Sequence, residues 1–167
     1  MFWTPENIPT MKPKIYVETS IISYLAARPS RDLVLAGHQQ ITYQWWEERR
    51  ADFESFASEA VIHEASAGDA EAARRRLEFL GSLPLLDITD EVSSLVEKLV
   101  QQGPIPPKAV VDAVHVAVSA VYGLDYLLTW NCSHLANAAM RTRINQVCIS
   151  SGYQAVVICT PEELMED

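Results

Sequence analysis

The chain has few cysteines and few glycines, and both shortages exclude classes of protein. Its three cysteines, Cys132, Cys148 and Cys159, are an odd number and lack the paired spacing of a zinc site. We therefore expect free thiols that serve packing in a reducing cytoplasm. The six glycines form no glycine-rich phosphate loop. This absence weighs against a phosphohydrolase that binds small nucleotides through such a loop.

Long hydrophobic runs are also missing. No window offers the roughly 18 uncharged apolar residues that a membrane span requires, and Met1–Lys14 lacks the apolar centre of a secretion signal. We expect a cytoplasmic protein without a membrane partner. The remaining composition is that of a globular protein, with 49% hydrophobic residues. The length of 167 residues predicts one domain, residues 14–167, after an N-terminal arm at residues 1–13.

Positive charge is in deficit, and the net charge is −9. Proteins that bind nucleic acid usually carry a basic surface, so this charge opposes such a partner. A metal-dependent nuclease, however, needs clustered carboxylates, whose charge the bound cations offset in part. The arginines are bunched at Arg49–Arg50, at Arg74–Arg76, and at Arg141 with Arg143. Because each bunch is also compatible with a solvated helix face, charge does not decide between these classes.

Short apolar runs alternate with helical patterns along the chain. Strands are expected at Lys14–Val17, Asp52–Ala57, Leu83–Ile88, Asp125–Thr129 and Ala155–Cys159. Helices are expected at Ile21–Leu25, Arg31–Arg50 (capped by Ser30), Glu59–Ala65 (capped by Ser58), Ala70–Leu80 (capped by Asp69), Asp90–Gln102 (capped by Thr89), Ala109–Tyr122, Ser133–Ile144 and after Pro161. Strands joined through helices require crossover connections. The pattern therefore predicts one α/β domain with a mostly parallel sheet and helices on both faces.

Polar side chains follow two of the expected strands where each gives way to a helix. Glu18 ends the first strand, and Asn131 comes two residues after the fourth. Ligands of open parallel sheets bind outside the carboxyl ends of the strands. We therefore expect a functional site at this edge.

Asp112 is the strongest anomaly in the sequence. It lies in an apolar helix among residues that are expected to be buried, where an unpaired ionised carboxylate is costly. It must be paired, bound to metal, neutralised or placed at the rim of a pocket, and pairing with Lys108 is the structural alternative. Perturbed carboxylates in clefts are typical of functional sites. His115, one turn later, is either a partner of this site or a hydrogen-bonded core histidine.

Two further residues have both a structural and a functional interpretation. Glu64 is either an exposed helix acid or part of the site, and His134 either caps a helix or contacts phosphate. Together, Glu18, Glu64 and Asp112, with Asn131 as a neutral oxygen donor, offer only oxygen ligands from four segments. Mg²⁺ and Mn²⁺ prefer such ligands. The sequence predicts a divalent metal site if the four segments meet.

These segments resemble the PIN-domain family, and more closely the VapC-like toxins of type II toxin–antitoxin pairs. The likeness rests on Tyr16–Ser20, the helix with Glu64, Val111–Ala117 and Leu127–Asn131, and it spans about residues 14–163. The resemblance implies a three-layer α/β/α sandwich around a parallel sheet. It also implies an acidic pocket that binds Mg²⁺ or Mn²⁺ and hydrolyses RNA, a small antitoxin partner and a homodimer.

The resemblance also assigns roles to residues. The family's four acidic positions, which bind metal and carry catalysis, correspond to Glu18, Glu64, Asp112 and Asn131. Hydroxyl residues that line the family's pocket correspond to Thr19 and Thr129, which we expect to bind substrate together with His134. We expect Glu18 and Asp112 to ligate metal directly. Glu64 would bind it through water or help to deprotonate the attacking water, and Asn131 would orient a water or a weaker second ion.

Two positions depart from the family pattern. Glu18 and Asn131 stand where the family usually has aspartate, so one carboxylate is longer by a methylene and one anion is lost. A site with one fewer anion holds a second cation more weakly. The alternative function is therefore a catalytically weak or inactive PIN-like binding module.

The sequence also suggests a contact surface for partners. Tyr43, Trp45 and Trp46 lie close together in one expected helix, and aromatic residues are enriched at binding interfaces. One interpretation is that they contribute to the homodimer. The alternative is one tryptophan in the core and the other half-buried at the surface.

Overall fold

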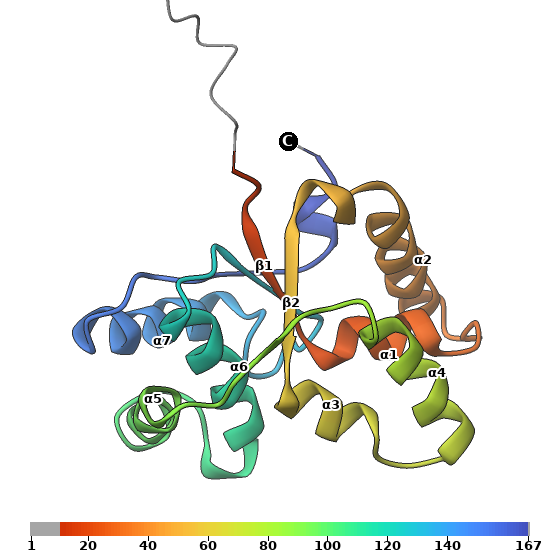
Figure 1. Cartoon of the computed structure of the whole chain (residues 1–167). Coiled ribbons are helices and arrows are strands. Elements are labelled where there is room, and N and C mark those ends of the chain that lie inside the picture. Colours follow the sequence, from red (N-terminus) through yellow and green to blue (C-terminus); the bar gives the residue numbers. More distant parts are fainter. Residues whose placement is uncertain (1–10, 167) are drawn as a thin grey trace, which may run out of the picture.

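A five-stranded sheet forms the centre of the structure, a computed structural model that describes residues 11–166 (Figure 1). The strands are β1 (Lys14–Val17), β2 (Glu54–Ser58), β3 (Leu85–Leu86), β4 (Tyr126–Leu128) and β5 (Val157–Cys159). Their spatial order is β3-β2-β1-β4-β5, and all four neighbouring pairs are parallel. The predicted parallel sheet is confirmed. Most of the predicted N-terminal arm lies outside the described residues.

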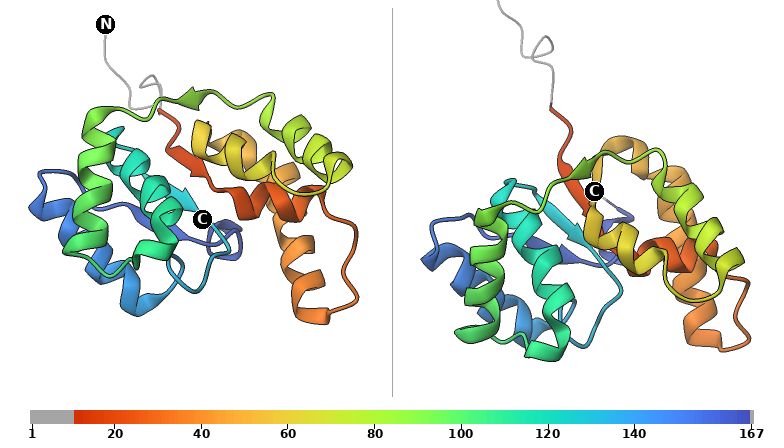
Figure 2. Two further views of the ribbon diagram at one scale, coloured as in Figure 1. Left: turned by 90° about the horizontal axis from the view of Figure 1, so that it is seen from below. Right: turned by 60° about the horizontal axis from the view of Figure 1, so that its bottom comes forward.

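Helices cover both faces of this sheet (Figures 1 and 2). One side carries α1 (Thr19–Ala26), α2 (Leu33–Glu48), α3 (Glu59–Ala65) and α4 (Ala70–Leu80). The other side carries α5 (Asp90–Gln101), α6 (Val110–Val121) and α7 (Ala138–Ser150). Short 3₁₀ turns occur at Arg50–Asp52, Pro107–Ala109 and Glu162–Leu164. The predicted three-layer α/β/α sandwich is therefore confirmed.

The order of the strands reverses between β1 and β4. The chain moves outward from β1 to β2 and β3, and then returns to the other side of β1 as β4 and β5. Helices diverge to opposite faces at such a point, and a crevice opens at the carboxyl ends of the two strands. Val17 is paired with Leu128, so Glu18 and Thr129 emerge from the sheet at the same level.

The sheet is held by an apolar core. Ile15 and Val17 on β1 and Leu127 and Leu128 on β4 are completely buried. The three cysteines are free thiols, and Cys148 and Cys159 are buried while Cys132 is exposed. Burial raises the pKa of Cys148 to about 11 and that of Cys159 to about 12, so both remain protonated at neutral pH. The packing role predicted for the cysteines thus holds for these two. In the described residues, no helix has the length and apolar content to cross a bilayer.

The two tryptophans of α2 are both buried. Trp45 has no exposed surface and Trp46 is 7% exposed, packed edge-on against Phe79. The interpretation in which both tryptophans supply an interface is wrong. The alternative is right in placing Trp45 in the core, but Trp46 is more buried than it expected. The buried face of this helix carries both indole rings, while Tyr43 stays 55% exposed.

Helix starts follow capping chemistry, with one correction. Asp69 and Thr89 accept hydrogen bonds from backbone N–H groups in the first turns of α4 and α5, as predicted. Asp32, and not Ser30, caps α2 by accepting from the N–H of Leu35 at 2.9 Å. Ser30 instead accepts from the N–H of Asp32, so the helix begins at Leu33, two residues later than predicted. Ser58 precedes α3 as predicted, but its side chain makes no capping hydrogen bond.

The helix predicted at Ser133–Ile144 is also displaced. Residues 131–137 form turns, and α7 runs from Ala138 to Ser150. Two asparagines explain the shift, because Asn131 accepts from the N–H of His134 and Asn137 accepts from the first N–H groups of α7. Asparagine side chains compete for backbone donors in this way and favour turns over continuous helix. His134 therefore lies in a turn and not at the start of a helix.

Candidate metal centre at the carboxyl edge of the sheet

Glu18 joins β1 to α1 and lies at the centre of the site. Its backbone N–H donates to the carbonyl of Leu128, which ties the end of β1 to β4. Its Oε2 accepts hydrogen bonds from the N–H and the hydroxyl of Ser20 and, at 2.7 Å, from the hydroxyl of Thr129. Its Oε1 lies 4.0 Å from Nε2 of His115. The carboxylate is 5% exposed and is therefore fixed by its neighbours, with one oxygen still able to bind a ligand.

Glu64, on α3, lies beside Glu18 and His115. Its Oε1 accepts hydrogen bonds from the Thr19 hydroxyl and from Nε2 of His115, each at 2.7 Å. Burial alone favours the protonated acid, but the hydrogen bonds from His115 and Thr19 outweigh it and lower the pKa of Glu64 below its usual value. Glu64 is therefore an ionised carboxylate at neutral pH, held in place by two donors.

His115 connects these carboxylates to the core. The imidazole has no exposed surface, and its Nδ1 lies 2.7 Å from the hydroxyl of Tyr16, which in turn contacts the hydroxyl of Ser58. Because a carboxylate only accepts, the Nε2 that contacts Glu64 carries the proton, and in the neutral ring Nδ1 then accepts from Tyr16. Burial raises the pKa of Tyr16, so its phenol stays protonated and donates. The predicted core histidine is thus also a partner of the site.

Asp112 lies on α6, one turn before His115, and is half-buried. Burial raises its pKa above the usual value, although a hydrogen bond from the Asn131 side chain and the nearby histidines offset part of the effect. The Glu18 carboxylate is close enough to raise the pKa of Asp112 further. No ion pair joins Asp112 to Lys108 in the described part of the chain. The anomaly seen in the sequence is therefore a carboxylate beside other carboxylates.

Asn131 and Thr129 bring β4 into the site. The Asn131 N–H donates to the Thr129 hydroxyl at 2.9 Å, and Thr129 donates to Glu18. The Asn131 amide oxygen accepts from the N–H of His134 at 3.1 Å, so these two residues are locked in one turn. The site residues predicted from the sequence thus lie in one hydrogen-bonded region: Glu18, Thr19, Glu64, Asp112, Thr129, Asn131 and His134. His134 enters it through its backbone.

The donor set of this region fits a divalent cation. Ligand atoms of Glu18, Glu64 and His115 lie within 4.8 Å of one another, and Asp112 is adjacent. Among residues 11–166, no lysine or arginine forms an ion pair with any of the three carboxylates. Repulsion between acids without a cationic partner favours the binding of a metal ion. His115 donates from Nε2 to Glu64 and so holds this carboxylate in place, and its spacing from Asp112 in the sequence indicated the shared face.

The arginine bunches lie outside this region and are largely engaged. Arg74 and Arg75 form ion pairs with glutamates of their own helix, and Arg76 donates to the carbonyls of Ala65 and Ala67. Arg141 binds Glu163. These contacts favour the structural interpretation of both bunches.

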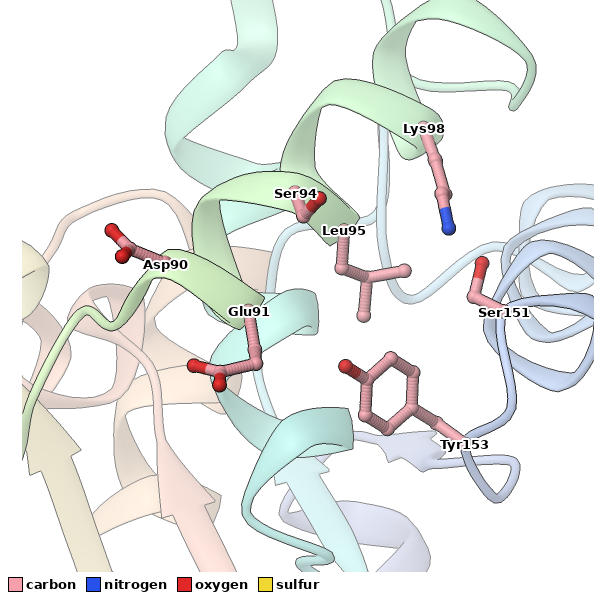
Figure 3. Close-up of a pocket in the computed structure, with 7 residues that line it drawn as sticks. All are labelled: Asp90, Glu91, Ser94, Leu95, Lys98, Ser151 and Tyr153. Carbon is pink, nitrogen blue, oxygen red and sulfur yellow. The ribbon is translucent and has the colours of Figure 1, made fainter.

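A surface pocket on the α5–α7 side differs from the acidic site (Figure 3). It has a volume of about 320 Å³ and is lined by Asp90, Glu91, Ser94, Leu95, Lys98, Ser151 and Tyr153. In Figure 3, Lys98 and Ser151 lie on one side of it, and the two acids lie on the other. Its acids do not converge on a buried imidazole or on the sheet edge. Substitutions in this pocket are therefore suitable controls for substitutions near the acidic site.

Solved structures with the same fold are known. No protein-family profile matches the sequence, and a search of curated proteins finds no match either. The crystal structure of Mycobacterium tuberculosis VapC20, a toxin that cleaves the sarcin–ricin loop, matches over 86% of this chain and 98% of its own, with 14% identity and a TM-score of 0.55. VapBC2 from Rickettsia felis, bound to a DNA fragment from its promoter, matches over 87% and 97%, with 16% identity and the same TM-score. The chain has a VapC-like PIN-domain fold.

The PIN-domain fold accounts for where the residues lie. Its parallel sheet reverses order between β1 and β4, and the acidic cluster occupies the carboxyl ends of these strands. The resemblance seen in the sequence and the fold seen in the structure thus point to the same edge. Because the two solved structures share 14% and 16% of residues with this chain, they establish the fold, and function rests on the site itself.

Proposed function

We propose that this chain is a metal-dependent endoribonuclease, the toxin of a toxin–antitoxin pair. The observation that carries the proposal is the cluster of Glu18, Glu64 and His115 at one edge of a PIN-like sheet, with Asp112 near Glu18 and no lysine or arginine partner in the described residues. The two solved structures with this fold include a toxin that cleaves RNA. A cytoplasmic location is part of this proposal.

Four side chains would hold the cation. Glu18 and Asp112 offer carboxylate oxygens from β1 and α6, Glu64 offers a third from α3, and Asn131 offers a neutral amide. Mg²⁺ or Mn²⁺ bound there supplies a Lewis acid that lowers the pKa of a water molecule and stabilises charge on the scissile phosphate.

The side chains of the protein prepare this chemistry. Thr19 and Thr129 donate to Glu64 and Glu18, and so fix the direction of the carboxylates. His115 donates to Glu64 and keeps it ionised, so the carboxylate can accept a hydrogen bond from the attacking water and orient it. Thr19, Thr129 and His134 are the residues proposed to contact the RNA.

Replacing Glu64 by glutamine tests the role of the water-orienting carboxylate. We expect Glu64→Gln to lower kcat for cleavage of single-stranded RNA with Mn²⁺ by about 10- to 100-fold, because the amide cannot accept a proton. Glu59→Gln is the matched control, since Glu59 is an exposed acid of the same helix. Equal rates for the two variants would remove Glu64 from the mechanism.

An inactive binding module is the second candidate function. Asn131 favours it, because this neutral amide already accepts from His134 and donates to Asp112, and adds no anion to the site. Titration with Mn²⁺ separates the candidates. The nuclease binds Mn²⁺ through Glu18 and Asp112, whereas an inactive pocket shows no affinity that depends on these residues.

A homodimer and an antitoxin complex complete the proposal. On α2, Leu33 is 88% exposed and Val34 is 69% exposed, so this helix presents apolar surface with Tyr43. Such exposed apolar side chains mark surfaces for protein partners. We expect a dimer mass by size-exclusion chromatography with light scattering at micromolar concentration, and dissociation by Val34→Asp. A monomer at that concentration contradicts this part of the proposal.

A further inference from the structure

Three aromatic rings lie beside the acidic site. Trp130 stands between Thr129 and Asn131, and its indole is nearly parallel to the ring of His38, with 4.1 Å between centroids and 14° between planes. Tyr24 is also nearly parallel to Trp130, at 6.2 Å and 26°. Trp130 is buried and its indole N–H donates to Thr42. Tyr24 and His38 are half-buried, so parts of both rings are open to a ligand.

The rings are connected to the acidic site through α1. The Ser20 hydroxyl donates to Glu18 and accepts from the N–H of Trp130. Tyr24 follows Ser20 by four residues, so both lie on one face of the helix. Tyr24 is six residues from Glu18, about 9 Å along a helix axis at 1.5 Å per residue. The rings therefore border the place where cleavage is proposed.

A cavity lies next to Tyr24. It has a volume of about 310 Å³, lies between α1 and α2, and is lined in part by Tyr24, Pro29, Gln40 and Tyr43. Figure 2 shows the connection between the two helices as an open loop.

That loop carries Arg28 and Arg31, both exposed. Within residues 11–166 neither forms an ion pair, in contrast to Arg74, Arg75 and Arg141. Arg28 stands between Ala27 and Pro29, which both line the cavity, so this loop brings positive charge near it in a protein whose net charge is −9.

Aromatic rings, arginines and a metal site for phosphodiester cleavage can all bind one class of ligand, a nucleic-acid strand with unpaired bases. Unpaired bases stack on aromatic side chains, and arginines contact the phosphates of the same strand. Bases in a duplex are already stacked and leave no face for a protein ring. We propose that Tyr24 and His38 form a stacking surface for an unpaired base next to the scissile phosphate. This inference rests on the proposed function.

Paired substitutions test the stacking surface. Tyr24→Leu and His38→Leu remove a ring, whereas Tyr24→Phe and His38→Phe keep one. With Mn²⁺ and single-stranded RNA, we expect each leucine variant to raise KM about 10-fold, within the range for loss of one stacked base, and to leave kcat within about twofold. The phenylalanine variants keep KM near that of the unchanged protein. Tyr153→Leu, in the pocket of Figure 3, is the control and keeps KM unchanged. Equal KM values for leucine and phenylalanine overturn the proposal.

A second measurement needs no substitution of the rings. Single-stranded RNAs that carry 2-aminopurine at successive positions are titrated with the non-cleaving Asp112→Asn protein. We expect quenching of fluorescence at one position and weaker binding of the corresponding duplex. Uniform fluorescence along the strand, or equal affinity for the duplex, contradicts the stacking surface. If the unchanged protein binds with position-specific quenching but does not cleave with Mn²⁺, the nuclease proposal fails and the stacking surface stands.

Discussion

The Asp112→Asn protein is expected to lose RNA cleavage almost completely, by at least about 100- to 1,000-fold in kcat/KM, the range for removal of a group that stabilises charge in an active site. Asp112 is half-buried beside Glu18 and Asn131, and burial raises its pKa. No lysine or arginine of the described residues pairs with this carboxylate, so it is available to a metal ion. The measurement is single-turnover cleavage of labelled RNA with saturating Mn²⁺.

Loss of activity must be separated from loss of fold. The pKa of Asp112 is raised in the folded state, so its ionisation opposes folding as the pH rises through that pKa. In metal-free buffer at pH 8, Asp112→Asn should therefore unfold at a temperature no lower than the unchanged protein. Asp87→Asn, at an exposed position, is the control for cleavage. An Asp112→Asn protein that cleaves at the original rate removes Asp112 from the mechanism.

Removal of divalent metal has the second large expected effect. With EDTA, cleavage should fall below detection, about 1,000-fold or more, and Mn²⁺ or Mg²⁺ should restore it, because charge stabilisation and water activation both depend on the ion. Binding also stabilises the fold, by about 2.7 kcal/mol at a metal concentration 100 times the dissociation constant. Differential scanning calorimetry with and without Mn²⁺ measures this gain.

A matched variant shows whether the gain comes from the acidic site. The Glu18→Gln/Asp112→Asn protein loses two proposed ligands, so Mn²⁺ should leave its unfolding temperature unchanged. Cleavage that continues in EDTA, or equal stabilisation of both proteins by Mn²⁺, shows that the carboxylates act without metal or that the ion binds elsewhere.

The position of the site could be predicted from local chemistry. Glu18 and Asn131 follow buried strands, and parallel strands present their carboxyl ends at one edge. Asp112 stands out because an acid inside an apolar helix needs an explanation. The centres of the strands could also be predicted from local sequence, because short runs of Val, Ile and Leu are typical of buried strands.

Contacts between elements that are distant in the chain could not be predicted from the sequence. The helical period indicates that Asp112 and His115 share a face, but it does not show that this face meets Glu64 of α3 and Tyr16 of β1. Those partners depend on the packing of the layers. The predicted start of α7 was wrong for another reason. Asn131 stabilises a turn at residues where helix propensity alone allows a helix.

The shared cation is tested most directly by a crystal of the protein grown with Mn²⁺, in which anomalous scattering locates the ion. The account predicts one manganese peak at the carboxyl edge of the sheet, coordinated by oxygens of both Glu18 and Asp112. A well-ordered site in which these carboxylates coordinate no ion at millimolar Mn²⁺, or manganese bound only at other acids, contradicts it.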